Sequence, residues 1–245
     1  MNAETIQLLV LIIIFVSALI RAVFGFGHAL VAMPLLAMIV GVKIAAPLVA
    51  LVAGTMALAI LIENRRHLHF TTVWQLTVSS LIGIPIGLVF LKEAYEPMVN
   101  GLLAVVIIIF SLYHLVRPKV SIPGDDRLAF LFGFLAGILG GAYNTNGPPI
   151  IIYATLKKWP PESFRTTLQG CFLVTSLFII AGHGMAGLFT ATVFRLFIIS
   201  LPVLLLAVYL GGKVNRSIPQ RRFEQIVFVF LLVIGGVLLI RSIGS

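Results

Sequence analysis

The 245-residue chain has few charged residues and a single cysteine. Charged residues make up 10% of the sequence, whereas ordinary soluble proteins carry roughly a quarter. Hydrophobic residues make up 60%, so the composition excludes a soluble enzyme and indicates an integral membrane protein. The single cysteine, Cys171, excludes an intrachain disulfide and argues against a cysteine-based metal site. We expect it to be a small core residue.

Acidic side chains are absent from the interior of the apolar segments. All eight lie at segment ends or in loops: Glu4, Glu63, Glu93, Glu96, Asp125, Asp126, Glu162 and Glu224. A carboxylate within the membrane is the usual group for binding a cation or relaying a proton, so its absence argues against a cation transporter. Known catalytic and nucleotide-binding motifs are also missing. We therefore expect no catalytic residue, no metal, no cofactor and no enzymatic activity.

The formal net charge of +9 does not indicate a nucleic-acid partner, because no basic run is interleaved with aromatic residues. The basic residues instead follow the loops. Twelve of the 17 lie in loops that we place in the cytoplasm: Arg65, Arg66, Arg117, Lys119, Arg127, Lys157, Lys158, Arg165, Lys213, Arg216, Arg221 and Arg222. Cytoplasmic loops of membrane proteins are enriched in Lys and Arg. We therefore predict that both termini face the outside.

Ten apolar windows follow one another along the chain. They are Ile6–Val23, Ala29–Val40, Ile44–Ile62, Val73–Leu91, Met98–Val116, Leu128–Leu139, Pro149–Leu156, Thr166–Ala181, Thr192–Gly211 and Phe223–Ile240. The first lacks a basic leader and a small-residue cleavage site, so we interpret it as a retained membrane segment. A spanning helix needs about 20 residues, which makes the seventh window too short to cross the bilayer alone. The prolines and charges of 117–127 divide the chain into two sets of five.

Two glycine-rich breaks interrupt the apolar sequence, and they correspond when Pro34 is aligned with Pro149. The first is Gly25-Phe-Gly-His-Ala-Leu-Val-Ala-Met-Pro34 and the second is Gly140-Gly-Ala-Tyr-Asn-Thr-Asn-Gly-Pro-Pro149. At the second break, the apolar segment that begins near Leu128 should stop near Gly141, and a new segment should start near Pro148. Paired interruptions in two halves are typical of transporter binding sites. The alternative is that the glycines only let helices pack closely.

The two sets of segments predict a duplicated fold. Ile44–Phe70 aligns with Ser163–Phe189 at a shift of 119 residues. Because each set holds an odd number of segments, the second enters the membrane from the opposite side. We predict an all-α polytopic membrane protein with an N-terminal repeat (1–116), a cytoplasmic connector (117–127) and an inverted C-terminal repeat (128–245). The first two segments of each repeat form a broken pair or a re-entrant hairpin.

The polar groups in and beside these segments are cationic or neutral, which suits an anion. Helix N-termini near His28 and Gly147 would offer unpaired N–H groups, and the asparagine amides would add donors. We expect a substrate site built from the two breaks and their neighbours: Arg21, Gly25, Gly27, His28, Gly141, Tyr143, Asn144, Thr145, Asn146, Gly147 and Gln169.

Several of these side chains have a structural alternative. Arg21 could extend along its apolar stem to the membrane surface. His28 could bind the anion or titrate during transport, or be a buried structural histidine. Asn144 and Asn146 could cap the helix that follows them. Three further groups near segment ends are expected at the membrane surface: His114, His183 and Arg195.

Three stretches of the sequence carry a specific pattern. They are Arg21-Ala-Val-Phe-Gly-Phe-Gly-His-Ala-Leu-Val-Ala-Met-Pro-Leu-Leu36, Asn144-Thr-Asn-Gly-Pro-Pro-Ile-Ile-Ile-Tyr153 and Phe164-Arg-Thr-Thr-Leu-Gln-Gly-Cys-Phe172. Together they resemble the TauE/SafE sulfite exporter family, and the resemblance covers nearly the entire chain. It implies a permease that moves sulfite, an organosulfonate or another sulfur anion across the bacterial inner membrane, mostly outward. Phe26 and His28 interrupt the family's run of glycines, which leaves the substrate open.

The sequence and the resemblance together predict a secondary transporter for a small inorganic or organic sulfur anion. One repeat would rock against the other and expose a site between the breaks to each side in turn. An anion channel and a non-transporting assembly or scaffold protein are the alternatives. The partners expected are the anion and the lipid bilayer, without nucleic acid, and a homodimer is left open.

Overall fold

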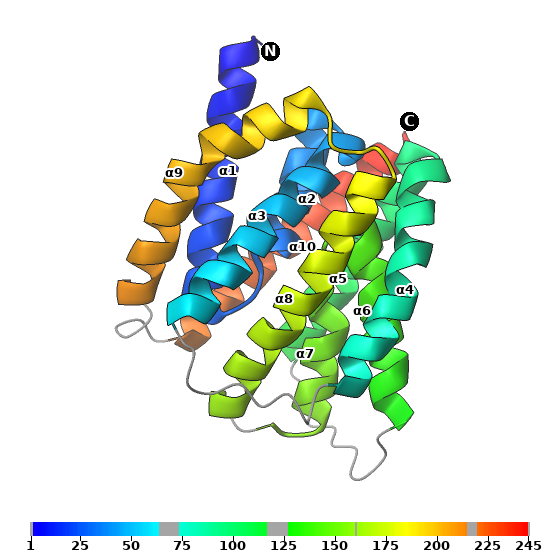
Figure 1. Ribbon diagram of the computed structural model, residues 1–245, viewed down its shortest axis with the longest axis vertical. Coiled ribbons are helices and arrows are strands. Elements are labelled where there is room, and N and C mark those ends of the chain that lie inside the picture. The colour runs from blue at the N-terminus through cyan, green and yellow to red at the C-terminus, as the bar shows by residue number, and fades with distance from the viewer. Residues whose placement is uncertain (1, 64–73, 117–126, 160, 215–219, 245) are drawn as a thin grey trace.

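The computed structural model describes residues 2–63, 74–116, 127–159, 161–214 and 220–244 (Figure 1). Within these ranges the regular structure is entirely helical, which confirms the predicted all-α class and its ten segments. The helices are α1 (Ala3–Phe24), α2 (His28–Val40), α3 (Val42–Glu63), α4 (Trp74–Glu93), α5 (Glu96–Val116), α6 (Arg127–Tyr143), α7 (Gly147–Leu156), α8 (Pro161–Met185), α9 (Ala191–Val214) and α10 (Gln220–Ile243).

Seven helices in the described part are long and apolar enough to cross a membrane: α1, α3, α4, α5, α8, α9 and α10. The protein is therefore a multi-pass helical membrane protein. The other three are shorter. With a rise of 1.5 Å per residue, the 10 residues of α7 extend about 15 Å, half of the roughly 30 Å hydrocarbon core.

The two breaks end one helix and start the next within three residues. α1 ends at Phe24, and Gly25 takes the left-handed conformation (φ 84°) while its N–H donates to Arg21 O at 2.7 Å. α2 then begins at His28. In the second break Asn144 takes the same conformation (φ 56°). The restart predicted near Pro148 is confirmed, because α7 begins at Gly147.

The stop predicted near Gly141 lies two residues later, because α6 continues to Tyr143. Gly141 is a packing residue: a Cβ there would collide with Ile84 O of α4. Gly140 also lies inside α6, where a Cβ would come within 3.2 Å of Asn146 Cβ. The helix therefore passes through both glycines and ends where Asn144 turns left-handed.

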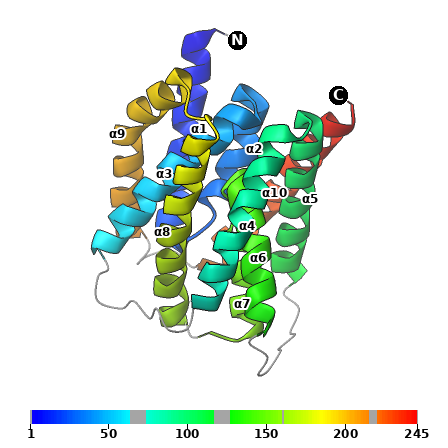
Figure 2. The ribbon, with the colours of Figure 1, turned by 45° about the vertical axis from the view of Figure 1, so that its right-hand side comes forward.

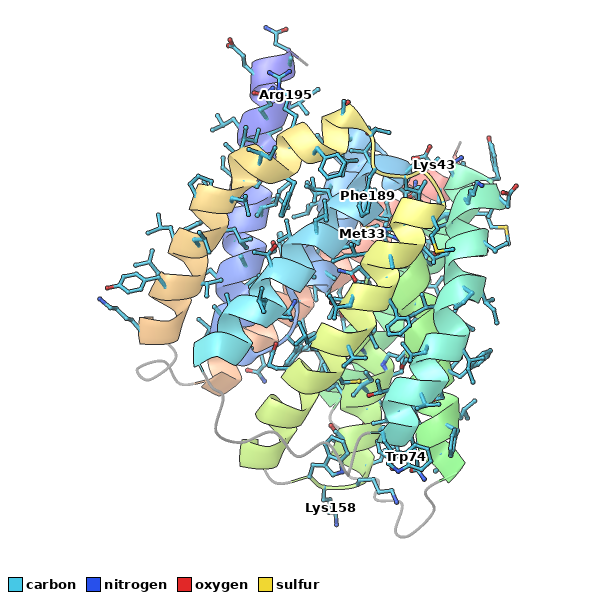
Figure 3. All side chains as sticks on the ribbon, in the orientation of Figure 1. Met33, Lys43, Trp74, Lys158, Phe189 and Arg195 are labelled. Carbon is cyan, nitrogen blue, oxygen red and sulfur yellow. The ribbon has the colours of Figure 1, made fainter. Side chains whose placement is uncertain are left out.

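Each interrupted pair turns back at its break, and the two pairs enter the molecule from opposite ends (Figures 1 and 2). The chain descends along α1 and returns along α2, whereas α6 rises from the lower end and α7 returns to it. Both termini lie at the upper end (Figure 1). Lys158 and Trp74 lie at the lower end, and Lys43 and Arg195 at the upper end (Figure 3).

Most of the basic residues assigned to the cytoplasm cannot be placed. Arg65, Arg66, Arg117, Lys119 and Arg216 lie outside the described residues, as does the predicted connector up to residue 126. The side chains of Arg127, Arg165, Arg221 and Arg222 also lie outside the described set. The assignment of membrane sides therefore stays a prediction.

The helix boundaries recur at a fixed spacing. The end of α1, the start of α2 and the start of α3 each have a counterpart 119 residues later in α6, α7 and α8 (24 to 143, 28 to 147 and 42 to 161). The alignment of Pro34 with Pro149 is therefore wrong by four residues, about one helical turn. Pro34 lies inside α2, whereas Pro149 lies in the first turn of α7.

The two sets of five helices are interlocked. α4 packs against α6 and α1 packs against α9, so each of these pairs joins a helix from either side of the connector. α5 packs against α10, and α3 packs against α8 and α2. Small residues allow the closest of these approaches. A Cβ on Gly137 of α6 would collide with Ser80 O of α4, and one on Gly133 would collide with Ser79 Oγ.

The close contact of α4 with α6 predicts that a change to alanine lowers stability at a glycine inside the contact and raises it at a glycine outside the contact. Gly137→Ala should destabilise the protein by about 1–3 kcal/mol, because backbone of α4 must move to admit the methyl group. Gly236→Ala on α10 is the control, since nothing lies within 4 Å of its Cβ position and alanine favours the helix by about 0.5–1 kcal/mol. Thermal unfolding in detergent measures both. Equal melting temperatures for the two variants would contradict the close α4–α6 contact.

Candidate functional site

Both breaks line one cavity of about 30 Å³. It is lined by Arg21, Phe26, Gly27, His28, Ala29, Leu30, Ala53, Asn144, Thr145, Asn146, Gly147, Pro148, Phe172 and Ser176. A cavity needs about 10–15 Å³ to hold one water, so this one admits a small polar group without rearrangement. A larger ligand requires its lining side chains to move apart.

The cavity brings together seven of the eleven predicted site residues: Arg21, Gly27, His28, Asn144, Thr145, Asn146 and Gly147. Four do not line it. Gly25 and Gln169 are joined by a hydrogen bond beside the cavity. Gly141 packs on α4, and the Tyr143 hydroxyl donates to Val99 O of α5 at 2.8 Å. The structure thus places Gly141 and Tyr143 in helix packing.

Arg21 is buried beside the cavity. Its side chain is 4% exposed, so the alternative that it extends to the membrane surface is wrong. Nη1 donates to Ala53 O and Nη2 donates to Gln169 Oε1, both at 3.1 Å. The guanidinium carbon lies 5.5 Å from the centroid of the Phe172 ring. α1, α3 and α8 together hold the group in place.

The described partners of Arg21 are all neutral. A backbone carbonyl, an amide oxygen and an aromatic ring surround the guanidinium, and its Nε has no hydrogen-bond partner among the described residues. Burying a charge is costly unless an opposite charge compensates for it. An anion in this cavity would supply the opposite charge that these partners lack.

Gln169 holds the first break against α8. Its Oε1 accepts from Arg21 while its Nε2 donates to Gly25 O at 2.5 Å, which fixes the orientation of the amide. Asn144 makes the corresponding connection from the second break, because its Nδ2 donates to Val49 O of α3 at 3.1 Å. Each break is therefore tied to a long helix from the other side of the connector.

The alternative that Asn146 caps α7 is wrong. The structure shows no side-chain capping bond at that position; the Nδ2 of Asn146 donates instead to Thr175 Oγ1 of α8 at 2.7 Å. The Asn144 amide reaches α3 rather than the start of α7. An amide nitrogen carries two N–H groups, so each asparagine keeps a second donor beyond the bond it makes here.

Two of the three groups expected at the membrane surface lie elsewhere. His183 is fully buried near the end of α8, where its Nε2 donates to Gly141 O of α6 at 3.2 Å. His114 is half-buried among aromatic rings, with its centroid 4.3 Å from that of Phe228. Neighbouring helices cover both positions. Arg195 is exposed at the upper end, as expected (Figure 3).

Outside the two breaks, the sequence prediction missed Phe172 and Ser176 of α8 and Ala53 of α3. One signal could have found the first two. Gln169, Phe172 and Ser176 follow one another at spacings of three and four, which places them on one face of a helix. Ala53 carries no such signal, because its contribution is a backbone carbonyl and the small size of its side chain.

The left-handed conformation of Asn144 predicts how two substitutions should differ. Asn144→Gly keeps this conformation at little cost, whereas Asn144→Ala adds about 1–2 kcal/mol of strain. Both variants lose the bond to Val49 O. Thermal unfolding should therefore show Asn144→Ala less stable than Asn144→Gly by that amount. The reverse order would mean that the turn tolerates a side chain and that the bond alone matters.

Comparison with known proteins decides the family. The family described as sulfite exporter TauE/SafE matches residues 9–238, from within α1 to within α10. The chain belongs to the TauE/SafE family. A curated TauE/SafE relative, the probable sulfite/organosulfonate exporter TauE of Cupriavidus necator, is 24% identical over 234 residues. The alignment covers 92% of this chain and 90% of the relative.

TauE/SafE membership confirms the resemblance drawn from the three sequence stretches. The family is described as exporters, which fits the expectation of a chain that is not an enzyme. A second match, GPI mannosyltransferase 2 of Candida albicans, is 26% identical over 170 residues and covers 65% of this chain. It carries no argument, because the alignment covers only 39% of that protein. No solved structure matches the chain.

Proposed function

We propose that this protein is a secondary transporter that moves a small sulfur-containing oxyanion, of the sulfite or organosulfonate type, outward across the bacterial inner membrane. Membership of the TauE/SafE family and the name of the Cupriavidus necator relative support the substrate class. The observation that carries the proposal is the burial of Arg21 in a cavity between two helix breaks, among neutral partners.

Backbone groups add to the attraction of this cavity for an anion. The first turn of α2 lines it through His28, Ala29 and Leu30, whose N–H groups have no acceptor one turn earlier in the helix. α7 offers fewer such groups, because Pro148 and Pro149 have no N–H. The second break compensates with the remaining amide donors of Asn144 and Asn146. The site therefore combines one cation with polar donors from both breaks.

Alternating access is the mechanism that we propose. The opposite courses of the two hairpins and the spacing of 119 residues support inverted repeats at 1–116 and 128–245. The pairs α1–α9 and α4–α6 each draw on both repeats, so the bodies that move past one another are mixed. The bonds of Gln169 to Gly25 and of Asn144 to Val49 cross between repeats and would rearrange during this motion.

The membrane potential favours one direction of anion transport. With the Lys- and Arg-rich loops in the cytoplasm and the termini outside, an inside-negative potential drives an anion outward. The driving force is about 2.3 kcal/mol per charge per 100 mV. Outward movement of an anion therefore requires no carboxylate relay within the described helices.

Thermal stability of the detergent-purified protein against a panel of anions tests the proposal. The panel holds sulfite, thiosulfate, sulfate, sulfoacetate, taurine, acetate and chloride, and a ligand at 100 times its dissociation constant adds about 2.7 kcal/mol. We expect stabilisation by one sulfur anion and a smaller shift in Asn144→Gly. Counterflow in proteoliposomes then separates a transporter from a channel, which shows none. A panel without any shift would favour a scaffold protein and contradict the proposal.

A further inference from the structure

His28 is the second ionisable group of the cavity, and its contacts define the position of its ring proton. The side chain is 1% exposed, and its Nδ1 lies 2.9 Å from Ser17 Oγ of α1. Ser17 has one hydroxyl proton and donates it to Ile14 O at 3.1 Å. The hydroxyl oxygen is therefore the acceptor of a bond from Nδ1–H. In neutral His28 the other nitrogen, Nε2, then carries a lone pair.

Nε2 is buried and has no hydrogen-bond partner among the described residues. His28 and Arg21 line the same cavity, so a bound anion lies close to both. An unmet acceptor in a buried site is unfavourable by itself. An anion oxygen also presents lone pairs, and the two acceptors repel unless a proton lies between them.

The neighbours of His28 do not supply this proton. Arg21 on α1 is the cation in the same cavity, and a guanidinium does not release its proton. α3, α8 and the second break contribute side chains that do not titrate near neutral pH: Ala53, Phe172, Ser176, Asn144, Thr145 and Asn146. On the far side of Phe26 and Leu30, α10 contributes apolar side chains. His114 of α5 packs on the Phe26 ring, with centroids 6.2 Å apart.

We infer that the cavity takes up its anion together with one proton, which binds between His28 Nε2 and an anion oxygen. The inference rests on the proposed function and specifies the charge of what is bound. A sulfite dianion and one proton carry a single negative charge, which the single charge of Arg21 balances. A buried site is most favourable when the charges inside it sum to zero. One negative charge would then leave with each sulfite transported.

Isothermal titration calorimetry of the full-length protein in detergent tests this inference. Sulfite is titrated at an alkaline pH at which the free anion is the dianion, in two buffers that differ in their enthalpy of ionisation. The wild type should take up one proton per sulfite bound. Its dissociation constant should rise about tenfold per pH unit over the alkaline range, as linkage to one proton requires.

Two matched variants locate the proton. His28→Gln puts an amide in place of the ring, so the variant should bind sulfite without proton uptake and without pH dependence. His183→Gln is the control, because His183 is also buried with one unpartnered ring nitrogen among the described residues, but lies outside the cavity lining. It should keep the uptake of one proton. A second outcome also supports the inference. If the wild type takes up one proton per sulfite, and His28→Gln is folded but is the only variant that does not bind sulfite, the anion contacts the ring.

The contrary outcomes are distinct from one another. Sulfite binding by the wild type without proton uptake would overturn the inference and leave the proposed function standing. Proton uptake that persists in His28→Gln would place the proton on the anion itself and overturn the role of His28. Absence of sulfite binding in the wild type would remove the proposed substrate, and the inference with it.

Discussion

Arg21→Met should abolish anion binding without lowering the stability of the anion-free protein. Methionine keeps the apolar length of the side chain beside Phe172 and removes a buried charge whose partners are neutral. The two lost hydrogen bonds are offset by relief from burying the charge. Losing the partner of a buried ion costs about 2–5 kcal/mol, which weakens binding at least about thirty-fold.

Two companion variants make the Arg21 result specific. Arg21→Lys keeps the charge, but an ammonium lacks the planar fork that reaches Ala53 O and Gln169 together, so binding should be intermediate. Arg195→Met removes an exposed arginine at the upper end and should bind as the wild type does. Melting temperatures with and without sulfite measure all three. Wild-type stabilisation by sulfite in a folded Arg21→Met would remove Arg21 from the site.

Gln169→Glu should also abolish anion binding, because it supplies Arg21 with a permanent counter-ion. The carboxylate would stand where Gln169 Oε1 now accepts from the guanidinium at 3.1 Å. The same change removes the donor to Gly25 O, so a second variant must account for that loss. Gln169→Met loses both bonds without adding charge and should weaken binding about tenfold or less, the cost of one to two buried hydrogen bonds.

The difference between the two Gln169 variants isolates the charge. If the cavity selects anions through Arg21, the glutamate variant should show no shift in melting temperature with sulfite, and the methionine variant a reduced shift. Uptake in proteoliposomes should follow the same order. Equal binding by both would mean that Gln169 acts only by holding the first break in place.

The sequence predicted the helices and the two breaks because both signals are local. A run of apolar residues or a left-handed turn needs few neighbours to be recognised. Arg21 and His28 were found for a related reason: ionisable groups are rare inside membrane segments, so each one draws attention. The asparagines of the second break were found by their position beside glycine and proline.

The remaining features depend on contacts between distant segments. The sequence pattern predicts a helix stop near Gly141. Its partner Ile84 lies on α4, and only that contact shows that Gly141 is a packing residue. Asn146 has the composition of a helix cap but bonds to Thr175 of α8. His183 lies near a helix end and is nevertheless buried by α6. In each case a tertiary partner overrides the local signal.

The interlocked packing has a consequence for biosynthesis. α1 is made early, but α9, against which it packs, does not begin until Ala191. At a synthesis rate of roughly 5–20 residues per second, α1 is in the bilayer for on the order of ten seconds or more before α9 is made. During that time Arg21 lacks Gln169, because α8 has not been synthesised. An unfinished chain that ends after α5 would therefore hold Arg21 in the membrane with its bond to Ala53 but without Gln169 and Phe172, both of which lie on α8.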